Sequence, residues 1–167
     1  PILYQPIEEA SQPWHLCVTY PHLKDPYWLS VNYGMVEEVK RLGVTMKVLE
    51  AGGYPELTTQ IEQLKHCTNA ASDAIIVGTV SFNGLSPSIR KIAQTTPVIA
   101  AVNDIENVGI SAKAAVSWYT MGQKVGQYLA QRHPATGANT AKVSWFPVPK
   151  ESGCVEFIDD GLHDGIA

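Results

Sequence analysis

The sequence predicts an α/β fold built on a doubly wound parallel sheet, because short apolar runs alternate with helical patterns along most of the 167 residues. The apolar runs are rich in Val, Ile, Leu and Ala without polar alternation, which is typical of strands that are buried on both faces. The segments between the runs carry apolar residues at spacings of three and four, as amphipathic helices do. We therefore expect parallel strands joined by right-handed helical crossovers, with helices on both faces.

Five strands are predicted from the apolar runs, over residues 16–20, 45–49, 74–77, 98–102 and 142–146. The first helix is expected over residues 28–42. It should end at Gly43, because glycine readily adopts the left-handed conformation found just past a helix. Leu57, Ile61 and Leu64 have the spacing of one face of a second helix.

Three more helices follow the same pattern. Ser86 is expected to cap a short helix with a proline in its first turn. Ser117 is expected to cap a longer helix over residues 118–132, in which Gly122 and Gly126 permit close approach of the backbone to the sheet. The apolar face of the last helix carries Val155, Ile158, Leu162 and Ile166.

The organisation of the chain changes after His133, where a turn-rich segment begins. One strand and one helix follow that segment, and they cannot bury their own apolar faces. We therefore expect four parts: an N-terminal extension (1–13), a ligand-binding first lobe (14–133), a linker (134–141) and the first strand and helix of an incomplete second lobe (142–167).

Composition argues against several function classes. Lys and Arg number 12 against 16 Asp and Glu, a net charge of -4, and the basic residues form no patch, so we expect no nucleic-acid partner. No stretch approaches the roughly 20 apolar residues that span a bilayer, so direct membrane insertion is not expected. The chain starts without the features of a signal peptide, so we expect either a cytosolic protein or one whose leader is absent.

The three cysteines lack the spacing of a zinc site, so no metal is expected. Cys17 lies in the first predicted strand and Cys67 near the end of the second helix, and such elements pack together in this fold class. The pair is either a disulfide or two buried free thiols, and the residues alone leave both open.

Enzyme motifs for dinucleotides, nucleotides, acyl transfer and zinc hydrolysis are missing from the sequence. Cys154 stands at the start of a predicted helix, where the helix dipole lowers a thiol pKa. No histidine lies near it in sequence to act as a base, so we expect neither an enzyme nor a cofactor.

Polar and aromatic residues follow the predicted strands at their carboxyl ends, which is where open parallel sheets bind ligands. Any one of these aromatic residues fits the core as well as a site, but four successive junctions deliver such groups to one edge, where Thr79, Ser81 and Asn103 also lie. Aromatic faces beside a carboxylate suit a small cation-like ligand. The candidate ligand-binding residues are Asp25, Tyr27, Trp28, Tyr54, Asp104 and Trp118.

Three stretches resemble the TorT-type periplasmic binding proteins of trimethylamine N-oxide (TMAO) sensing systems: KDPYWLSVNYGM, KVLEAGGY and SWYTMGQ, in this order and spacing. The similarity runs from about Trp14 to the last residue. It implies the ribose-binding-like fold of two α/β lobes that close on a ligand, a periplasmic location after cleavage of a leader, and no catalysis. It also implies TMAO as the ligand and the periplasmic sensor domain of a membrane histidine kinase as the partner. An oxidising compartment favours the Cys17–Cys67 bridge.

The chemistry of TMAO suits these residues, since a trimethylated nitrogen is recognised by aromatic faces. The Tyr54 hydroxyl or a backbone N–H near Gly53 could donate to the oxide, and Asp25 would favour the cationic end or fix neighbouring donors. The chief alternative is a sugar-binding protein of the ribose-binding type, although the strand ends offer few polar groups and no arginine for hydroxyls. The effector domain of a repressor would require a helix-turn-helix before the first strand, which 13 residues cannot supply.

Overall fold

A five-stranded sheet forms the centre of the computed structural model, which describes residues 3, 5–134, 141–147 and 150–167. Its strand order is β2-β1-β3-β4-β5, and every neighbouring pair is parallel. The strands are β1 (His15–Tyr20), β2 (Thr45–Glu50), β3 (Ala74–Val77), β4 (Val98–Val102) and β5 (Ile110–Ala115). The predicted parallel α/β sheet is therefore confirmed.

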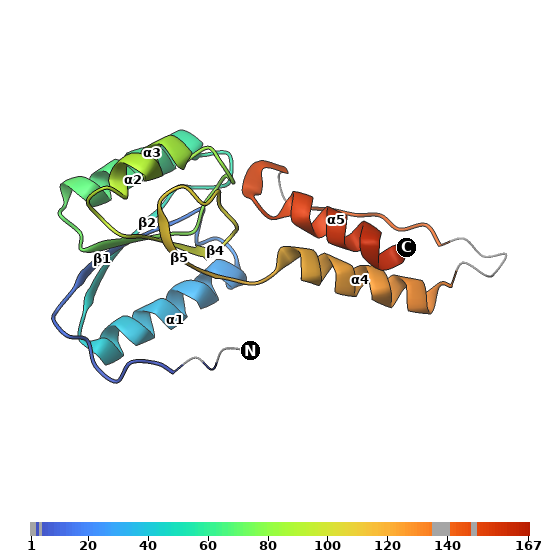
Figure 1. The fold of residues 1–167 in the computed structure, drawn as a ribbon, viewed down its shortest axis with the longest axis horizontal. Helices are drawn as coiled ribbons and strands as arrows, with labels where there is room; N and C mark the ends of the chain where they lie inside the picture. The colour runs from blue at the N-terminus through green and yellow to red at the C-terminus, as the bar shows by residue number, and fades with distance from the viewer. Residues whose placement is uncertain (1–2, 4, 135–140, 148–149) are drawn as a thin grey trace.

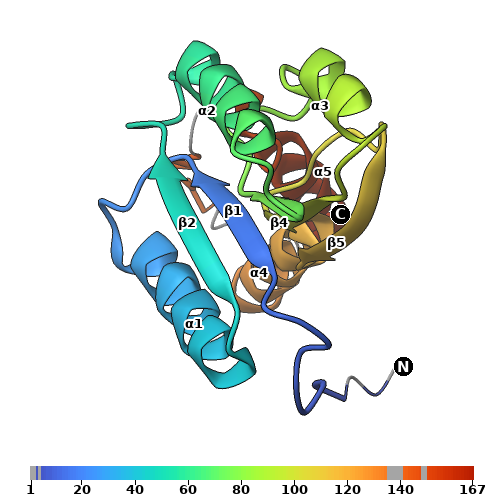
Figure 2. The ribbon, with the colours of Figure 1, turned by 90° about the vertical axis from the view of Figure 1, so that its left-hand side faces the viewer.

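Helices cover both faces of the sheet (Figures 1 and 2). Helix α1 (Pro26–Leu42) lies on one face, while α2 (Leu57–Asn69) and α3 (Ser86–Ile92) lie on the other. Because successive side chains of a strand point to opposite faces, Cys17 joins the core beneath α2 and α3 and Val18 joins the core beneath α1. This is the predicted doubly wound arrangement, and it is confirmed.

Helices α4 (Trp118–Arg132) and α5 (Val155–Ile166) pack against each other beyond the end of the sheet (Figure 1). A short 3-10 helix, η1 (Lys150–Ser152), precedes α5. The prediction that the glycines of α4 approach the sheet is wrong. A Cβ atom at Gly122 would overlap the Ile158 carbonyl group, so the missing side chain admits the α5 backbone instead.

Two predictions about strands are also corrected. Residues 142–146 do not form the predicted strand, because no strand of the described chain lies beside them to complete a hydrogen-bonded ladder. The pattern of apolar runs does not predict β5, whose sequence is ISAKAA. It pairs with β4 at the edge of the sheet, and an edge strand can leave such side chains exposed.

The helix ends follow the predictions in two of three cases. Gly43 ends α1 with φ 66°, and the Ser117 hydroxyl caps α4 by accepting from the Thr120 N–H at 3.1 Å. Ser86 is not a cap. It is already inside α3, and its hydroxyl group instead donates to the carboxylate of Glu106.

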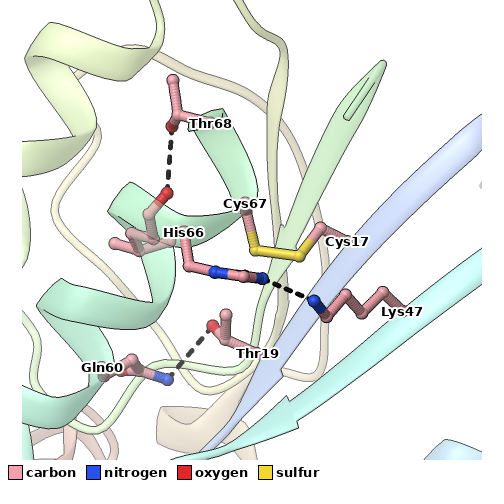
Figure 3. Close-up of a disulfide and its surroundings, with 8 residues drawn as sticks. Cys17, Thr19, Lys47, Gln60, His66, Cys67 and Thr68 are labelled. Carbon is pink, nitrogen blue, oxygen red and sulfur yellow. Dashed lines mark hydrogen bonds between the residues drawn. A yellow bond between two sulfur atoms is a disulfide. The ribbon is translucent and has the colours of Figure 1, made fainter. Parts of the chain in front are cut away.

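A disulfide joins Cys17 of β1 to Cys67 of α2 (Figure 3). Both residues are fully buried, and they are 50 positions apart in the sequence. Next to it, Lys47 Nζ and His66 Nε2 are 2.5 Å apart. The bridge ties α2 to the sheet, and α2 follows the loop that carries Tyr54.

Candidate ligand-binding site

Asp25 positions the first part of the site as the N-cap of α1. Its carboxylate accepts a hydrogen bond from the Trp28 backbone N–H at 2.9 Å, which satisfies one of the free donors of the first helical turn. The Asp25 side chain remains 46% exposed and lies 3.7 Å from His22 Nε2. Asp25 therefore fixes where α1 begins, while its second oxygen is the one that lies near His22.

Trp28 is buried, with 2% of its surface exposed. Its ring packs on Tyr20 at 5.4 Å between centroids and meets Tyr27 edge-on at 5.9 Å. A Cβ atom at Gly78 would lie only 2.6 Å from Cη2 of the indole, so the ring occupies the space that this glycine leaves. The structure thus places Trp28 behind the site, with its Nε1 edge 3.4 Å from the Tyr54 hydroxyl.

Tyr54 follows β2 through Gly52 and Gly53, whose φ angles of 102° and 154° are ones that glycine adopts without strain. The half-buried phenol oxygen lies 3.4 Å from Trp28 Nε1 and 3.4 Å from Asn103 Nδ2. The structure therefore brings together the groups that follow β1, β2 and β4 around one hydroxyl group.

Tyr27 stands beside this group and is 51% exposed. Partial burial, followed by the nearby Tyr54 and Asp25, raises the pKa of the Tyr27 hydroxyl, so the phenol stays neutral at physiological pH. Tyr27 is the most exposed of these rings, and it can offer a face to a ligand.

Asn103 follows β4 directly before the candidate residue Asp104, whose role in ligand binding stays a prediction. The Asn103 side chain is buried and donates to the Thr79 carbonyl oxygen at 2.9 Å. Asp104 instead accepts from Lys113 Nζ at 2.7 Å and from the Ile105 N–H at 2.9 Å. Both of these bonds go to one carboxylate oxygen, Oδ1, and the Asn103 amide is the group that reaches Tyr54.

Trp118 reaches the same edge from the start of α4. Its Nε1 donates to the Val102 carbonyl oxygen at 3.2 Å, one residue before Asn103. The ring is half-buried, and no contact among the described residues joins it directly to Trp28 or Tyr54. Trp118 therefore stands on the β4 side of the edge, whereas Trp28 and Tyr54 touch each other on the β1 side.

Gln60 of α2 forms a polar floor that sequence reasoning missed. The fully buried side chain donates to the Gly78 carbonyl oxygen at 2.8 Å and accepts from the Val80 N–H at 2.9 Å. A signal for it was present, since Gln60 stands among the apolar residues Leu57, Ile61 and Leu64 on the buried face of α2. A polar residue in such a stripe indicates a buried hydrogen-bonding role.

The segment around η1 packs against the chain segments that follow β3 and β4. Ser152 is fully buried, and a Cβ atom at Gly153 would overlap the Asp104 carbonyl oxygen. Phe157 meets Phe82 at 5.8 Å, and a cavity of about 290 Å³ lies between the two segments. Sequence reasoning gave this segment no role at the site.

Cys154 has no features of an activated nucleophile. The thiol is buried beside the Ser152 hydroxyl at 3.2 Å, and burial raises its pKa. The predicted lowering by the helix dipole is wrong, because desolvation of the thiolate outweighs it. Among the described residues, no cluster of three or more His, Cys, Asp or Glu side chains could hold a metal ion, and no helix is both long and apolar enough to cross a bilayer.

The family model for periplasmic binding proteins and the sugar binding domain of the LacI family matches residues 13–166. The chain belongs to this family. It is 40% identical over 161 residues to the periplasmic protein TorT of Escherichia coli K12, an alignment that covers 95% of this chain and 45% of TorT. The resemblance to TorT-type proteins is confirmed, and the chain spans about half the length of the curated relatives it matches.

Two kinds of solved structure are similar at high coverage. An ABC transporter solute binding protein from Bradyrhizobium sp. BTAi1, with bound BIS-TRIS, is 49% identical with a TM-score of 0.81, over 99% of this chain and 50% of its own. TorT in complex with the TorS sensor domain, in the presence of TMAO, is 37% identical with a TM-score of 0.73, over 92% of this chain and 52% of its own. These relatives are solute-binding proteins rather than enzymes.

Proposed function

We propose that this protein is a periplasmic, non-enzymatic solute-binding protein that binds TMAO at the strand edge and signals to the periplasmic sensor domain of a membrane histidine kinase. The observation that carries the proposal is the meeting of Trp28, Tyr54 and Asn103 around one hydroxyl group, flanked by Tyr27 and Trp118. The similarity to TorT, which has been crystallised with TorS, supports both the ligand and the partner.

Aromatic faces recognise the methylated end of TMAO. The three methyl groups spread the positive charge of the nitrogen over an apolar surface that has no hydrogen-bond donor. Each ring placed against that surface contributes about 0.5 to 2 kcal/mol by cation–π attraction. Tyr27 and Trp118 have exposed surface for this contact, whereas Trp28 supports Tyr54 from the core.

The oxide end of TMAO requires a hydrogen-bond donor. The Tyr54 hydroxyl provides one at the same edge, where it lies 3.4 Å from Trp28 Nε1 and 3.4 Å from Asn103 Nδ2. Asp25 and the neighbouring Tyr27 place negative charge and ring surface together, which suits a ligand whose positive and negative ends are adjacent.

Isothermal titration calorimetry of the full-length protein with TMAO tests this assignment. Tyr27→Ala and Trp118→Ala should each weaken binding by roughly 2- to 30-fold, the equivalent of one lost cation–π contact. Tyr33→Ala is the matched control, because Tyr33 is a 68% exposed tyrosine on the same helix as Tyr27. Unchanged affinity in both site variants would refute the aromatic site.

The sensor-domain partner is tested separately. The full-length protein should co-elute with the purified periplasmic domain of a TorS-type kinase on size-exclusion chromatography. The ligand and the kinase are linked through one conformational equilibrium in this proposal, so TMAO should change the measured affinity of the complex. A protein that binds TMAO but never the sensor domain would be a receptor without this signalling role.

A second candidate function is favoured by the 49% identical solute binding protein, whose ligand BIS-TRIS carries a tertiary amine among hydroxyl groups. The protein would then deliver an amine to an ABC transporter. The sugar-binding alternative has less support, because Asp104 Oδ1 and Asn103 Nδ2 already bond to protein groups, which leaves fewer partners for hydroxyls. Thermal-shift titrations with TMAO, hydroxylated amines and sugars separate the three, since only a true ligand raises the melting midpoint with its concentration.

The division into two lobes is also part of the proposal. The predicted boundary at residue 133 stays a prediction, and residues 135–140 of the predicted linker lie outside the described part of the chain. The packing of α4 on α5, away from the sheet, supports placing the first crossing between lobes at residues 115–118 instead. Trp118 would then stand at the hinge side of the cleft.

A further inference from the structure

The hydrogen bonds at the Tyr54 hydroxyl have a fixed direction. Trp28 Nε1 carries a proton and has no lone pair to offer, so it can only donate to the Tyr54 oxygen, at 3.4 Å. The Asn103 amide is oriented by its other contact, because Nδ2 lies 2.9 Å from the Thr79 carbonyl oxygen, which can only accept. The same Nδ2 atom therefore also donates to Tyr54, at 3.4 Å.

A phenol oxygen accepts up to two hydrogen bonds and donates one. At Tyr54 both accepted bonds come from N–H groups, and the phenol proton has no acceptor among the residues that the structure describes. The Tyr54 hydroxyl can therefore donate its proton to an acceptor on a ligand, at the edge where the ligand is proposed to bind.

The backbone before Asn103 supports a dedicated role for this residue. Val102 has φ 72°, a left-handed conformation that β-branched residues rarely adopt. Strain of this kind persists only where surrounding contacts hold it, and it gathers at binding sites. Here it turns the chain at the end of β4, so that the next side chain, Asn103, is buried beneath Tyr54.

We propose that Asn103 is a positioning residue that, together with Trp28, directs the Tyr54 O–H toward the ligand and makes the site select methylated amines that carry an acceptor oxygen. The inference rests on the proposed function and narrows its ligand class. The N-oxide oxygen accepts the Tyr54 proton, whereas tetramethylammonium has the same methyl surface and no acceptor. A donor left unpaired in a closed site disfavours the second ligand by roughly 10- to 100-fold.

Calorimetry with TMAO and with tetramethylammonium, on the full-length protein, tests the inference. Asn103→Asp keeps the size of the side chain, but a carboxylate only accepts and would take the Tyr54 proton for itself. We expect TMAO binding to weaken by at least about 10-fold and tetramethylammonium binding to stay or strengthen. Asn69→Asp, at the exposed end of α2, makes the same change of charge away from the site and should keep the wild-type ratio.

Tyr54→Phe provides a second test that does not depend on a buried charge. The ring stays and the donor is removed. The affinity for TMAO should therefore fall to that for tetramethylammonium, and the affinity for tetramethylammonium should change by less than about 3-fold. Circular dichroism checks that each variant folds, and if Asn103→Asp does not fold, Tyr54→Phe decides alone.

The outcomes separate this inference from the proposed function. If the wild type binds TMAO no better than tetramethylammonium, or if either folded variant keeps the wild-type ratio, the inference is overturned and TMAO binding stands. If the wild type binds neither ligand, the proposed function itself fails. A lost preference in Tyr54→Phe that is also seen in Asn103→Asp supports the inference.

Discussion

At the scale of single residues, the candidate site depends on the close contact between Trp28 and Gly78. Gly78→Ala would place a methyl group 2.6 to 2.8 Å from the indole ring, so the ring must move. We expect a loss of about 1 to 3 kcal/mol of unfolding free energy in urea titrations, with weaker TMAO binding because Trp28 also contacts Tyr54.

Gly34→Ala is the control for this substitution. Gly34 lies within α1, and a Cβ atom there meets nothing within 4 Å. Alanine should therefore stabilise the helix by about 0.5 to 1 kcal/mol, since glycine is the poorer helix former. Equal changes in the free energy of unfolding for the two substitutions would show that the contact between Gly78 and Trp28 does not contribute to stability.

Tyr20 gives the stability a dependence on alkaline pH. Burial raises the pKa of Tyr20 to about 12 from its ordinary value of 10.0. Between these values the unfolded chain loses the phenol proton and the folded protein keeps it, so stability falls as pH rises from about 10 to 12. Urea titrations at pH 9 and pH 11 should show this decline in the wild type and a smaller one in Tyr20→Phe. An identical decline in both would contradict the assignment.

Sequence reasoning at this scale found positions more reliably than contacts. Asp25, Tyr27, Trp28 and Tyr54 were expected together because parallel strands end at one edge, and the structure places them there. Two details depend on neighbouring side chains. Trp28 is buried because Gly78 leaves space for its ring, and Asp104 bonds to Lys113 while the Asn103 amide reaches Tyr54. Such pairings join distant parts of the chain, and a single sequence carries no spacing rule for them.

At the scale of elements, the Cys17–Cys67 disulfide links a strand to a helix across a loop of 50 residues. The chain-entropy model gives about 4 kcal/mol for a loop of this length. The double variant Cys17→Ala/Cys67→Ala should lose about 2 to 4 kcal/mol of unfolding free energy in urea. Dithiothreitol should lower the midpoint of the wild type and leave that of the double variant unchanged. A reductant effect of equal size on both proteins would exclude this bridge as its target.

Helices α4 and α5 meet through paired glycines, which are Gly122, Gly126, Gly161 and Gly165. In Gly126→Ala the new methyl group would overlap the Leu162 carbonyl oxygen and lie 2.8 Å from the Gly165 Cα atom. Hydrogen exchange should therefore accelerate in α5 and stay unchanged in the sheet. Alanine favours the helical state of α4 itself, so a local loss of protection would report the lost packing. Protection of α5 at the wild-type level would argue against this interface.

The same glycines show where prediction from sequence reached its limit for elements. Gly122 and Gly126 were expected to permit close approach of the helix backbone, and they do, but the partner is α5 rather than the sheet. Likewise, residues 142–146 have the composition of a strand without a neighbouring strand, while the weaker ISAKAA sequence of β5 pairs with β4. A strand is defined by its hydrogen bonds to a neighbouring strand, so composition alone gave the wrong prediction for residues 142–146 and for β5.

At the scale of the whole molecule, the site lies where two parts of the chain meet. The strand ends supply Tyr54 and Asn103, and the segment around Gly153 rests on the Asp104 carbonyl group from the other side. Because the chain spans about half the length of its curated relatives, further contacts from the full-length protein are part of the proposal. Enclosure by both parts would strengthen each polar contact by excluding water.

The most direct test of the central claim is a crystal structure of the full-length protein grown with TMAO. The account predicts one ligand at the strand edge, with its oxygen about 2.7 Å from the Tyr54 hydroxyl and its methyl groups against Tyr27 and Trp118. A protein that binds TMAO in solution but holds it away from Tyr54, with these rings packed only on protein, would contradict it.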